Sequence, residues 1–247
     1  MNGLNRPPIA VAIFQIRYES GEIQLKDFVS LDQRIKHHLP IRRENIHVGI
    51  NLNNTSIPLG ESQLSAKSNA AIDAYIYQSV DQKTKLEISN GTITLVEEHP
   101  YEGWDVFKGS VIQYLNILSE LLNRVTVSRL SIRFINKFSL NDFDHPEEYF
   151  TTLITDSTRH GLPYPLNKYG FRLVMDIPDS EIYSIVNQNV ENVGDRSFSY
   201  TFDIDVLDRQ TLAFDLNTIS ANIEALRAIK NKIFFDGITQ KTIDLCN

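Results

Sequence analysis

Residues 85–98 read KLEISNGTITLVEE, and residues 104–122 read WDVFKGSVIQYLNILSELL. In the first stretch, two alternating runs rich in β-branched residues, Lys85–Ser89 and Thr92–Glu97, flank Asn90-Gly91. Because both turn residues tolerate positive φ, this pattern predicts a β-hairpin closed by a type I′ turn. In the second stretch, large apolar residues recur every three or four positions, which predicts a helix with one apolar face that covers a sheet. That face consists of Trp104, Phe107, Val111, Tyr114, Leu118 and Leu121.

The rest of the first half is also rich in strand signals. Pro7-Pro8 blocks a helix from entering on the N-terminal side, and the β-branched and aromatic run that follows predicts a buried strand over Ile9–Tyr18. Periodicity and loop composition predict the remaining elements. These are a short helix at Val29–His38, strands at Ile46–Leu52 and Ile72–Val80, and a loop over residues 53–60.

The second half repeats the order of strands followed by a long helix. Its predicted strands are Leu130–Phe138, Phe171–Asp176 and Phe198–Leu207, with a short helix near Glu147–Thr155. A final helix begins at about Ser220 and carries four apolar residues on one face, namely Ile223, Leu226, Ile229 and Ile233.

Strands followed by one long helix in each half predict an α+β fold rather than alternating βαβ units. We expect two related units, each an antiparallel sheet with a long helix, packed as one body. Their predicted bounds are residues 1–126 and 127–247, and the shared order suggests an internal duplication.

Composition places the chain among globular proteins. Of its 247 residues, 42% are apolar and 22% are charged. The longest apolar run, Ile9–Phe14, is far shorter than the roughly 20 residues that cross a bilayer, and no signal-peptide pattern opens the sequence. The single cysteine, Cys246, excludes an internal disulfide and a multi-cysteine zinc site. We therefore expect a cytoplasmic protein with no membrane association.

Four segments together resemble a sporadically distributed family of bacterial proteins of about this length, whose function is not established. The segments are Pro7-Pro8-Ile9 with Ala12 and Ile16-Arg17-Tyr18; Arg133-Phe134-Ile135-Asn136-Lys137; Asp203-Ile204-Asp205; and Ile233-Phe234-Phe235-Asp236-Gly237-Ile238-Thr239. The resemblance implies mobile genes, as in defence or toxin–antitoxin islands. It brings no catalytic residues, and nothing in residues 19–66 contributes to it.

The clearest pair of acidic residues is Asp203 and Asp205. On a strand, both carboxylates lie on the face opposite the apolar side chains, about 6–7 Å apart. Such a pair is able to hold Mg²⁺, with Asp208 or Asp215 as a further ligand. The alternative that we favour is a structural one, in which the aspartates pair with arginine or lysine on a neighbouring strand. We expect no metal and no cofactor.

Arginines beside aromatic residues are the candidate ion-pair partners of these two aspartates. Arg17 and Arg133 each lie near the end of the leading strand of a half, and Asn136-Lys137 adds polar groups beside the second. A half-buried arginine in a strand needs partners, and the two aspartates are available. This predicts an ion-paired seam between the halves, with an anion-binding pocket as the alternative.

Two charged clusters have simpler explanations than catalysis or nucleic-acid binding. The acidic cluster at residues 142–148 suggests a metal or a general base, but Asp144, Pro146 and Glu147 fit a helix cap. The basic concentration in residues 34–43 surrounds His37-His38, yet a net charge of −7 opposes nucleic-acid binding.

Nucleophilic catalysis has little support. The common nucleophile, zinc-protease and phosphate-loop motifs are missing from the sequence. We expect Cys246, one residue from the end, to be frayed and therefore a poor nucleophile.

Ile233-Phe234-Phe235 places three large apolar residues around more than half of the final helix. At least one of the three must contact another element, a second protomer or a ligand. Because catalytic motifs are missing, the sequence favours a non-enzymatic protein that binds a macromolecule, with a protein partner or a homodimer as the expected association. An enzyme without a recognisable motif and a SecB-like peptide-holding chaperone remain the alternatives.

Overall fold

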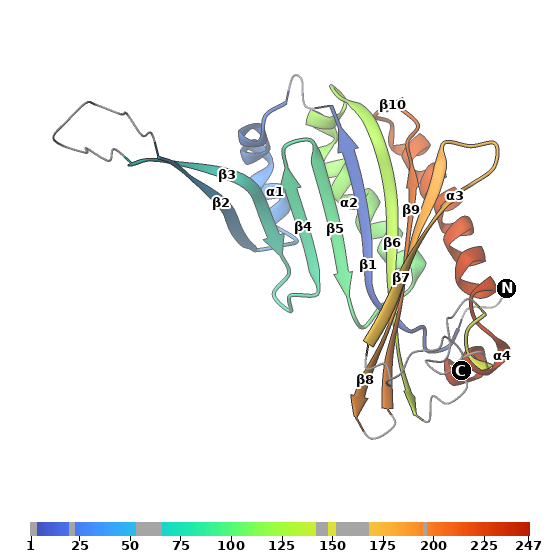
Figure 1. Cartoon of the computed structure of the whole chain (residues 1–247). Coiled ribbons are helices and arrows are strands. Elements are labelled where there is room, and N and C mark those ends of the chain that lie inside the picture. Colours follow the sequence, from blue (N-terminus) through green and yellow to red (C-terminus); the bar gives the residue numbers. More distant parts are fainter. Residues whose placement is uncertain (1–3, 20–22, 53–65, 142–147, 152–167, 195–196) are drawn as a thin grey trace, which may run out of the picture.

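One antiparallel sheet organises the chain in the computed structural model, which describes residues 4–19, 23–52, 66–141, 148–151, 168–194 and 197–247 (Figure 1). The fold is α+β, as the sequence predicts. The strands are β1 (Ile9–Tyr18), β2 (Ile41–Leu52), β3 (Ala66–Gln78), β4 (Thr84–Ser89), β5 (Thr92–Glu98), β6 (Thr126–Asn141), β7 (Lys168–Asp176), β8 (Ile182–Gly194), β9 (Ser197–Asp208) and β10 (Leu212–Ala213). The helices are η1 (Leu25–Leu31, a 3₁₀ helix), α1 (Asp32–Lys36), α2 (Trp104–Leu122), α3 (Leu216–Asp236) and α4 (Gln240–Leu245).

The strand order is β2-β3-β4-β5-β1-β6-β9-β8-β7, with β10 paired to β6. In each half the leading strand, β1 or β6, lies against the last long strand of the meander that follows it, β5 or β9. The two leading strands pair with each other, with Phe14 opposite Ile132, so the sheet is continuous across residue 126. The β2–β3 hairpin projects from one end of the sheet (Figure 1).

Both long helices cover the same face of the sheet; in Figure 1, α2 lies behind the strands and α3 stands at their right-hand side. Helix α2 has the predicted bounds, and all six residues of its predicted apolar face are buried. Its Trp104 and Phe107 rings lie 6.4 and 5.8 Å from the ring of Phe134 on β6. Helix α3 packs on β6 and β9 and contacts α2. The main core therefore lies between these helices and the central strands.

The predicted hairpin is present, but its turn is not type I′. Only Gly91 has a positive φ, at 74°, and Asn90 does not. A type I′ turn requires positive φ at both positions. The Asn90 side chain instead accepts a hydrogen bond from the backbone N–H of Leu25 (3.2 Å), so this residue anchors the start of η1.

Several elements of the second half differ from the prediction. The helix predicted near Glu147–Thr155 is wrong over residues 148–151, where Phe150 forms an isolated bridge to Ile238. Its predicted capping residues lie outside the described residues. The loop predicted at residues 53–60 in the first half also lies outside them. Strand β8 escaped prediction because polar residues occupy both of its faces, and buried Gln188 is satisfied by the Tyr200 hydroxyl (2.9 Å). The short helix α4 was also not predicted.

Helix α3 starts earlier than predicted and buries a different set of residues. Asp215 caps it by accepting a hydrogen bond from the Thr218 N–H (2.7 Å). Its buried residues are Ile219, Ile223, Leu226, Lys230 and Phe234, whereas Ile229 and Ile233 are only partly buried. The predicted face is therefore wrong beyond Leu226, because a lysine occupies a position on the buried side.

Candidate functional site

A cleft of about 630 Å³ opens between the C-terminal half of α3, the start of α2, strand β6 and the segment that precedes β1. We call it the Lys230 cleft. Its apolar lining includes Pro7, Pro8, Tyr101, Trp104, Phe134, Phe234 and Phe235, and its polar lining includes Asn136, Arg227 and Lys230. This volume and this mixture of aromatic walls with a few polar groups are typical of ligand-binding sites.

Lys230 lies at the floor of the cleft, and only 8% of its surface is exposed. Its Nζ atom is 4.4 Å from the ring centre of Phe134 and 5.9 Å from that of Phe234. Within the described part of the chain, it forms no hydrogen bond and no ion pair. Burial, together with the nearby charge of Arg227, lowers the pKa of the Lys230 amine to about 8.

The rim beside Trp104 is held by a shared carboxylate. Glu224 accepts a hydrogen bond from Trp104 Nε1 (2.9 Å), and it forms ion pairs with Lys108 (2.8 Å) and Arg227 (3.5 Å). The Arg227 guanidinium also stacks over the indole at 4.7 Å. Two cations thus share one carboxylate, so Glu224 neutralises only one of the two positive charges at this rim.

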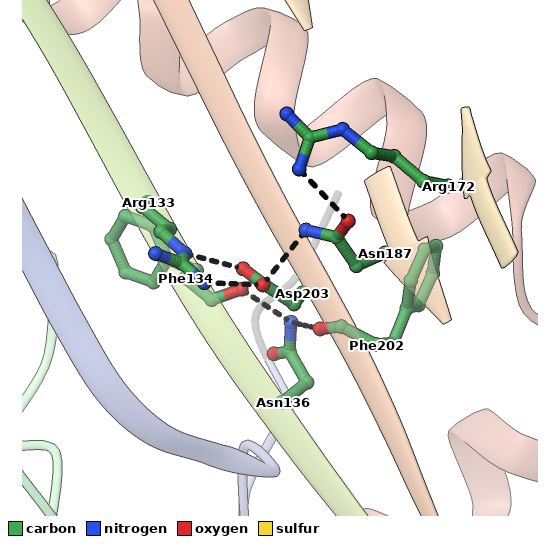
Figure 2. A network of polar contacts seen from close by, with 7 residues as sticks. All are labelled: Arg133, Phe134, Asn136, Arg172, Asn187, Phe202 and Asp203. Carbon is green, nitrogen blue, oxygen red and sulfur yellow. Dashed lines mark hydrogen bonds and ion pairs between the residues drawn. The ribbon is translucent and has the colours of Figure 1, made fainter. Parts of the chain in front are cut away.

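Asn136 forms part of the cleft floor and is 2% exposed. Its Nδ2 donates to the backbone carbonyls of Phe202 (2.9 Å) and Phe134 (3.4 Å), as Figure 2 shows. These bonds fix β6 to β9 directly beneath the aromatic wall. Asn136 therefore holds the floor in place, and its amide hydrogens are already used.

A second polar cluster lies on the other face of the sheet. Arg133 on β6 donates two hydrogen bonds to Asp203 on β9, at 2.8 and 2.6 Å. Asn187 on β8 donates to the same carboxylate (3.1 Å), and Arg172 on β7 makes a long contact of 3.5 Å with Asn187 (Figure 2). The cluster thus links four neighbouring strands.

Asp205 lies two residues from Asp203 on the same face, but its environment differs. Its Oδ1 atom is buried and has no hydrogen-bond partner among the described residues. Burial raises the pKa of the Asp205 carboxyl to about 6, against the opposing effect of Arg133. Two positions on the same face of β9 therefore hold a carboxylate with both oxygens paired and a carboxylate with one buried, unpaired oxygen.

Six of the seven candidate residues from the sequence fall into two places. Asn136, Phe234 and Phe235 line the Lys230 cleft, whereas Arg133, Asp203 and Asp205 lie on the opposite face. The Arg133 pair joins β6 to β9, both after residue 126. Arg17 is exposed on β1 opposite Arg129 and forms no ion pair within the described ranges.

The basic segment at residues 34–43 is neutralised in part by ion pairs. In the basic segment, Arg34 pairs with Glu120, and Lys36 and Arg42 both pair with Asp32. No cluster of three or more potential metal ligands is found in the described part of the chain.

Cys246 is not frayed, as the sequence predicted it to be. It is 4% exposed, and its backbone carbonyl accepts a hydrogen bond from the Arg6 N–H (2.8 Å). Burial raises the pKa of its thiol, which disfavours the thiolate.

No family model matches this sequence, and the comparison with curated proteins found no match. The resemblance to the sporadically distributed bacterial family therefore stays a prediction. Among the described residues, no helix has the length and apolar character that crossing a membrane requires.

The sequence reasoning missed Lys230, the central residue of the cleft. A signal was present, because Ile219, Ile223, Leu226 and Phe234 define a helical stripe in which Lys230 takes the intervening position. A lysine within an apolar stripe is either exposed at the edge of the stripe or buried at a functional site. Only the contact with Phe134, which comes from a distant strand, distinguishes the two.

The two aspartates should respond oppositely to replacement by asparagine. Asp203→Asn removes a charge-assisted bidentate pair, so we expect it to lower the free energy of unfolding by about 2 kcal/mol. Asp205→Asn removes a carboxylate that is costly once ionised, and we expect a gain of about 1 kcal/mol at pH 7.5.

The sign of the Asp205 effect follows from its raised pKa. The folded protein binds this proton more tightly than the unfolded chain, so the parent loses stability as pH rises from about 4 to about 6. The advantage of Asp205→Asn should therefore be absent at pH 4 and complete by pH 7.5, as measured by urea unfolding. Equal shifts in the two variants would contradict this assignment.

Proposed function

We propose that this chain is a non-enzymatic binding protein that takes an extended segment of a protein partner into the Lys230 cleft. The observation that carries the proposal is the buried Lys230 ammonium, which faces aromatic rings and has no anionic partner within the described ranges. A lysine whose pKa falls from 10.5 to about 8 lowers the stability of the folded state by roughly 3 kcal/mol at neutral pH. Such a cost is typical of functional sites.

The walls of the cleft support an apolar polypeptide as the ligand. Pro7 and Pro8 have no backbone N–H, and Tyr101, Trp104 and Phe235 present rings. Such walls accept apolar side chains and cover them from water. The predicted placement of the gene in a mobile or defence-type cluster also favours a protein partner, encoded nearby.

The proposal extends to the origin of the fold. We infer that residues 1–126 and 127–247 are two related units from an internal duplication, packed as one body. The strand order supports this, because each half pairs its leading strand with the last long strand of its own meander and ends in a long helix on the same face. The two leading strands then join the halves.

The fluorescence of Trp104 tests binding directly, because it is the chain's one tryptophan and it lines the cleft. We would titrate the protein with acetylated hexapeptides rich in leucine and phenylalanine. We expect a saturable change in emission, with dissociation constants of about 1–100 μM. No saturable change with any member of the panel would contradict the proposed function.

Two substitutions in α3 provide a matched comparison. Ala228 is exposed and lines the cleft, whereas Ala225 is exposed on the same helix outside the lining. Ala228→Phe narrows the cleft, and we expect it to weaken peptide binding by about tenfold or more. Ala225→Phe adds the same side chain without obstructing the cleft and should change the affinity by less than about twofold. Equal effects would show that the peptide binds elsewhere.

A further inference from the structure

We infer that the Lys230 cleft recognises the C-terminal carboxylate of its polypeptide ligand, with the carboxylate paired to Lys230 Nζ and the last apolar side chain placed among the aromatic walls. This inference rests on the proposed function, since it names the chemical group that the cleft selects. It identifies the ligand by its chain end rather than by an internal sequence.

Charge around the cleft favours an anion. Asp236 is the acidic residue of the lining, and it is already paired with Lys232 at 2.6 Å. Glu224 at the rim is shared by Lys108 and Arg227. Lys230 thus remains as the cation for which the described residues supply no counter-charge, and a ligand carboxylate would supply it.

The depth of Lys230 favours a chain end over an internal acidic side chain. The amine lies against Phe134, a sheet residue that is 1% exposed, so a ligand must reach the floor of the cleft to meet it. A chain that passed through this floor would bury peptide groups on both sides of the contact. The floor has few donors for them, because the Asn136 amide hydrogens are bound to backbone carbonyls. A chain that ends there buries fewer such groups.

The first test compares each hexapeptide as the free acid with the same peptide as its C-terminal amide, again by Trp104 fluorescence. We expect the acid to bind about 10–100 times more tightly to the unaltered protein. Saturable binding with equal affinities would overturn the carboxylate inference but leave the proposed function intact. If neither the acid nor the amide of any peptide showed saturable binding, the proposed function would be refuted.

Lys230→Met supplies the complementary test, with Lys26→Met as a control at an exposed site in η1. Methionine keeps the length of the side chain but removes the charge, so the acid and the amide should bind this variant equally. Its melting temperature should rise, because an unpaired buried charge is removed. Lys26→Met should retain the preference for the acid. A preference that persists in Lys230→Met would overturn the assignment of Lys230.

The effect of pH gives an independent readout on the unaltered chain. The protonated amine binds the carboxylate, so the affinity for the acid should fall as pH rises above about 8, and the affinity for the amide should not. Other titratable groups at the cleft are Arg227, Lys232 and Asp236 on α3, Glu224 and Lys108 at the rim, and Tyr101 before α2. Burial raises the pKa of Tyr101, so it keeps its proton in this range. A pH-independent preference for the acid would contradict the inference.

Decanoate distinguishes the two sources of an apolar carboxylate. It offers the charge and an alkyl chain without peptide groups, and we expect it to bind at least about tenfold more weakly than the best peptide acid. Equal or tighter binding of decanoate would overturn the polypeptide assignment and identify a small carboxylic acid as the ligand.

Discussion

Leu118→Asp should unfold the protein or lower its free energy of unfolding by about 4 kcal/mol or more. Leu118 is fully buried on α2, between the helix and the sheet. The substitution places a carboxylate among apolar side chains, and no cation of the described residues pairs with a group at this position. Chemical denaturation monitored by circular dichroism measures the effect.

Asn116→Asp is the matched control for this prediction. Asn116 is exposed on the same helix, two residues away, so the same new charge remains in water. We expect this control to change the stability by less than about 0.5 kcal/mol. A Leu118→Asp variant that melts within two or three degrees of the parent, about the effect of a surface change, would refute the packing of α2 on the sheet.

Phe234→Ser and Phe235→Ser should separate stability from binding. Phe234 is 5% exposed, and its ring stacks on Phe202 at 6.0 Å. Its replacement leaves a cavity and a buried hydroxyl, with an expected cost of about 4 kcal/mol. Phe235 is only partly buried and lines the cleft, so its replacement should cost about 1–2 kcal/mol while it weakens peptide binding severalfold.

Size-exclusion chromatography completes the comparison of the two phenylalanines. If Phe235 serves the cleft, Phe235→Ser should elute as the parent does and still lose peptide affinity. A change in oligomeric state instead would assign Phe235 to an interface between copies of the chain. Two stable variants with unchanged association and unchanged affinity would contradict both roles.

The elements that the sequence predicted best are those whose local pattern is strongest. Helix α2 has the predicted bounds because its apolar residues recur every three or four positions, and strand β1 has them because buried residues occupy every second position from Ala12 to Tyr18. Strand β8 was missed because Asn187, Gln188 and Asn189 conceal its alternation. Its polar residues are satisfied by partners on neighbouring strands, and no local pattern reveals such partners.

The site was less predictable than the fold, because it depends on contacts between distant segments. Phe234 and Phe235 were singled out from their spacing on a helix, and both line the cleft. Lys230 was not, since its burial requires Phe134, which comes from β6, almost 100 residues earlier. The union of the halves into one sheet likewise depends on the pairing of β1 with β6, which neither strand's own pattern specifies.

The segment at residues 233–239 contributes both to the core and to the Lys230 cleft. A Cβ at Gly237 would lie 2.7 Å from the Phe202 ring, so the end of α3 approaches β9 more closely than any other residue would allow. The Thr239 N–H then donates to the Tyr149 carbonyl (2.9 Å). This fixed end positions Phe234 in the core and Phe235 at the cleft.

A crystal structure of the protein with a tightly binding hexapeptide acid tests the central claim most directly. We predict that a terminal carboxylate oxygen lies within about 3 Å of Lys230 Nζ, with the last side chain between the Phe134 and Phe235 rings. A peptide bound on the open face of the sheet near Arg133, or a cleft filled by another part of the same chain, would contradict the account.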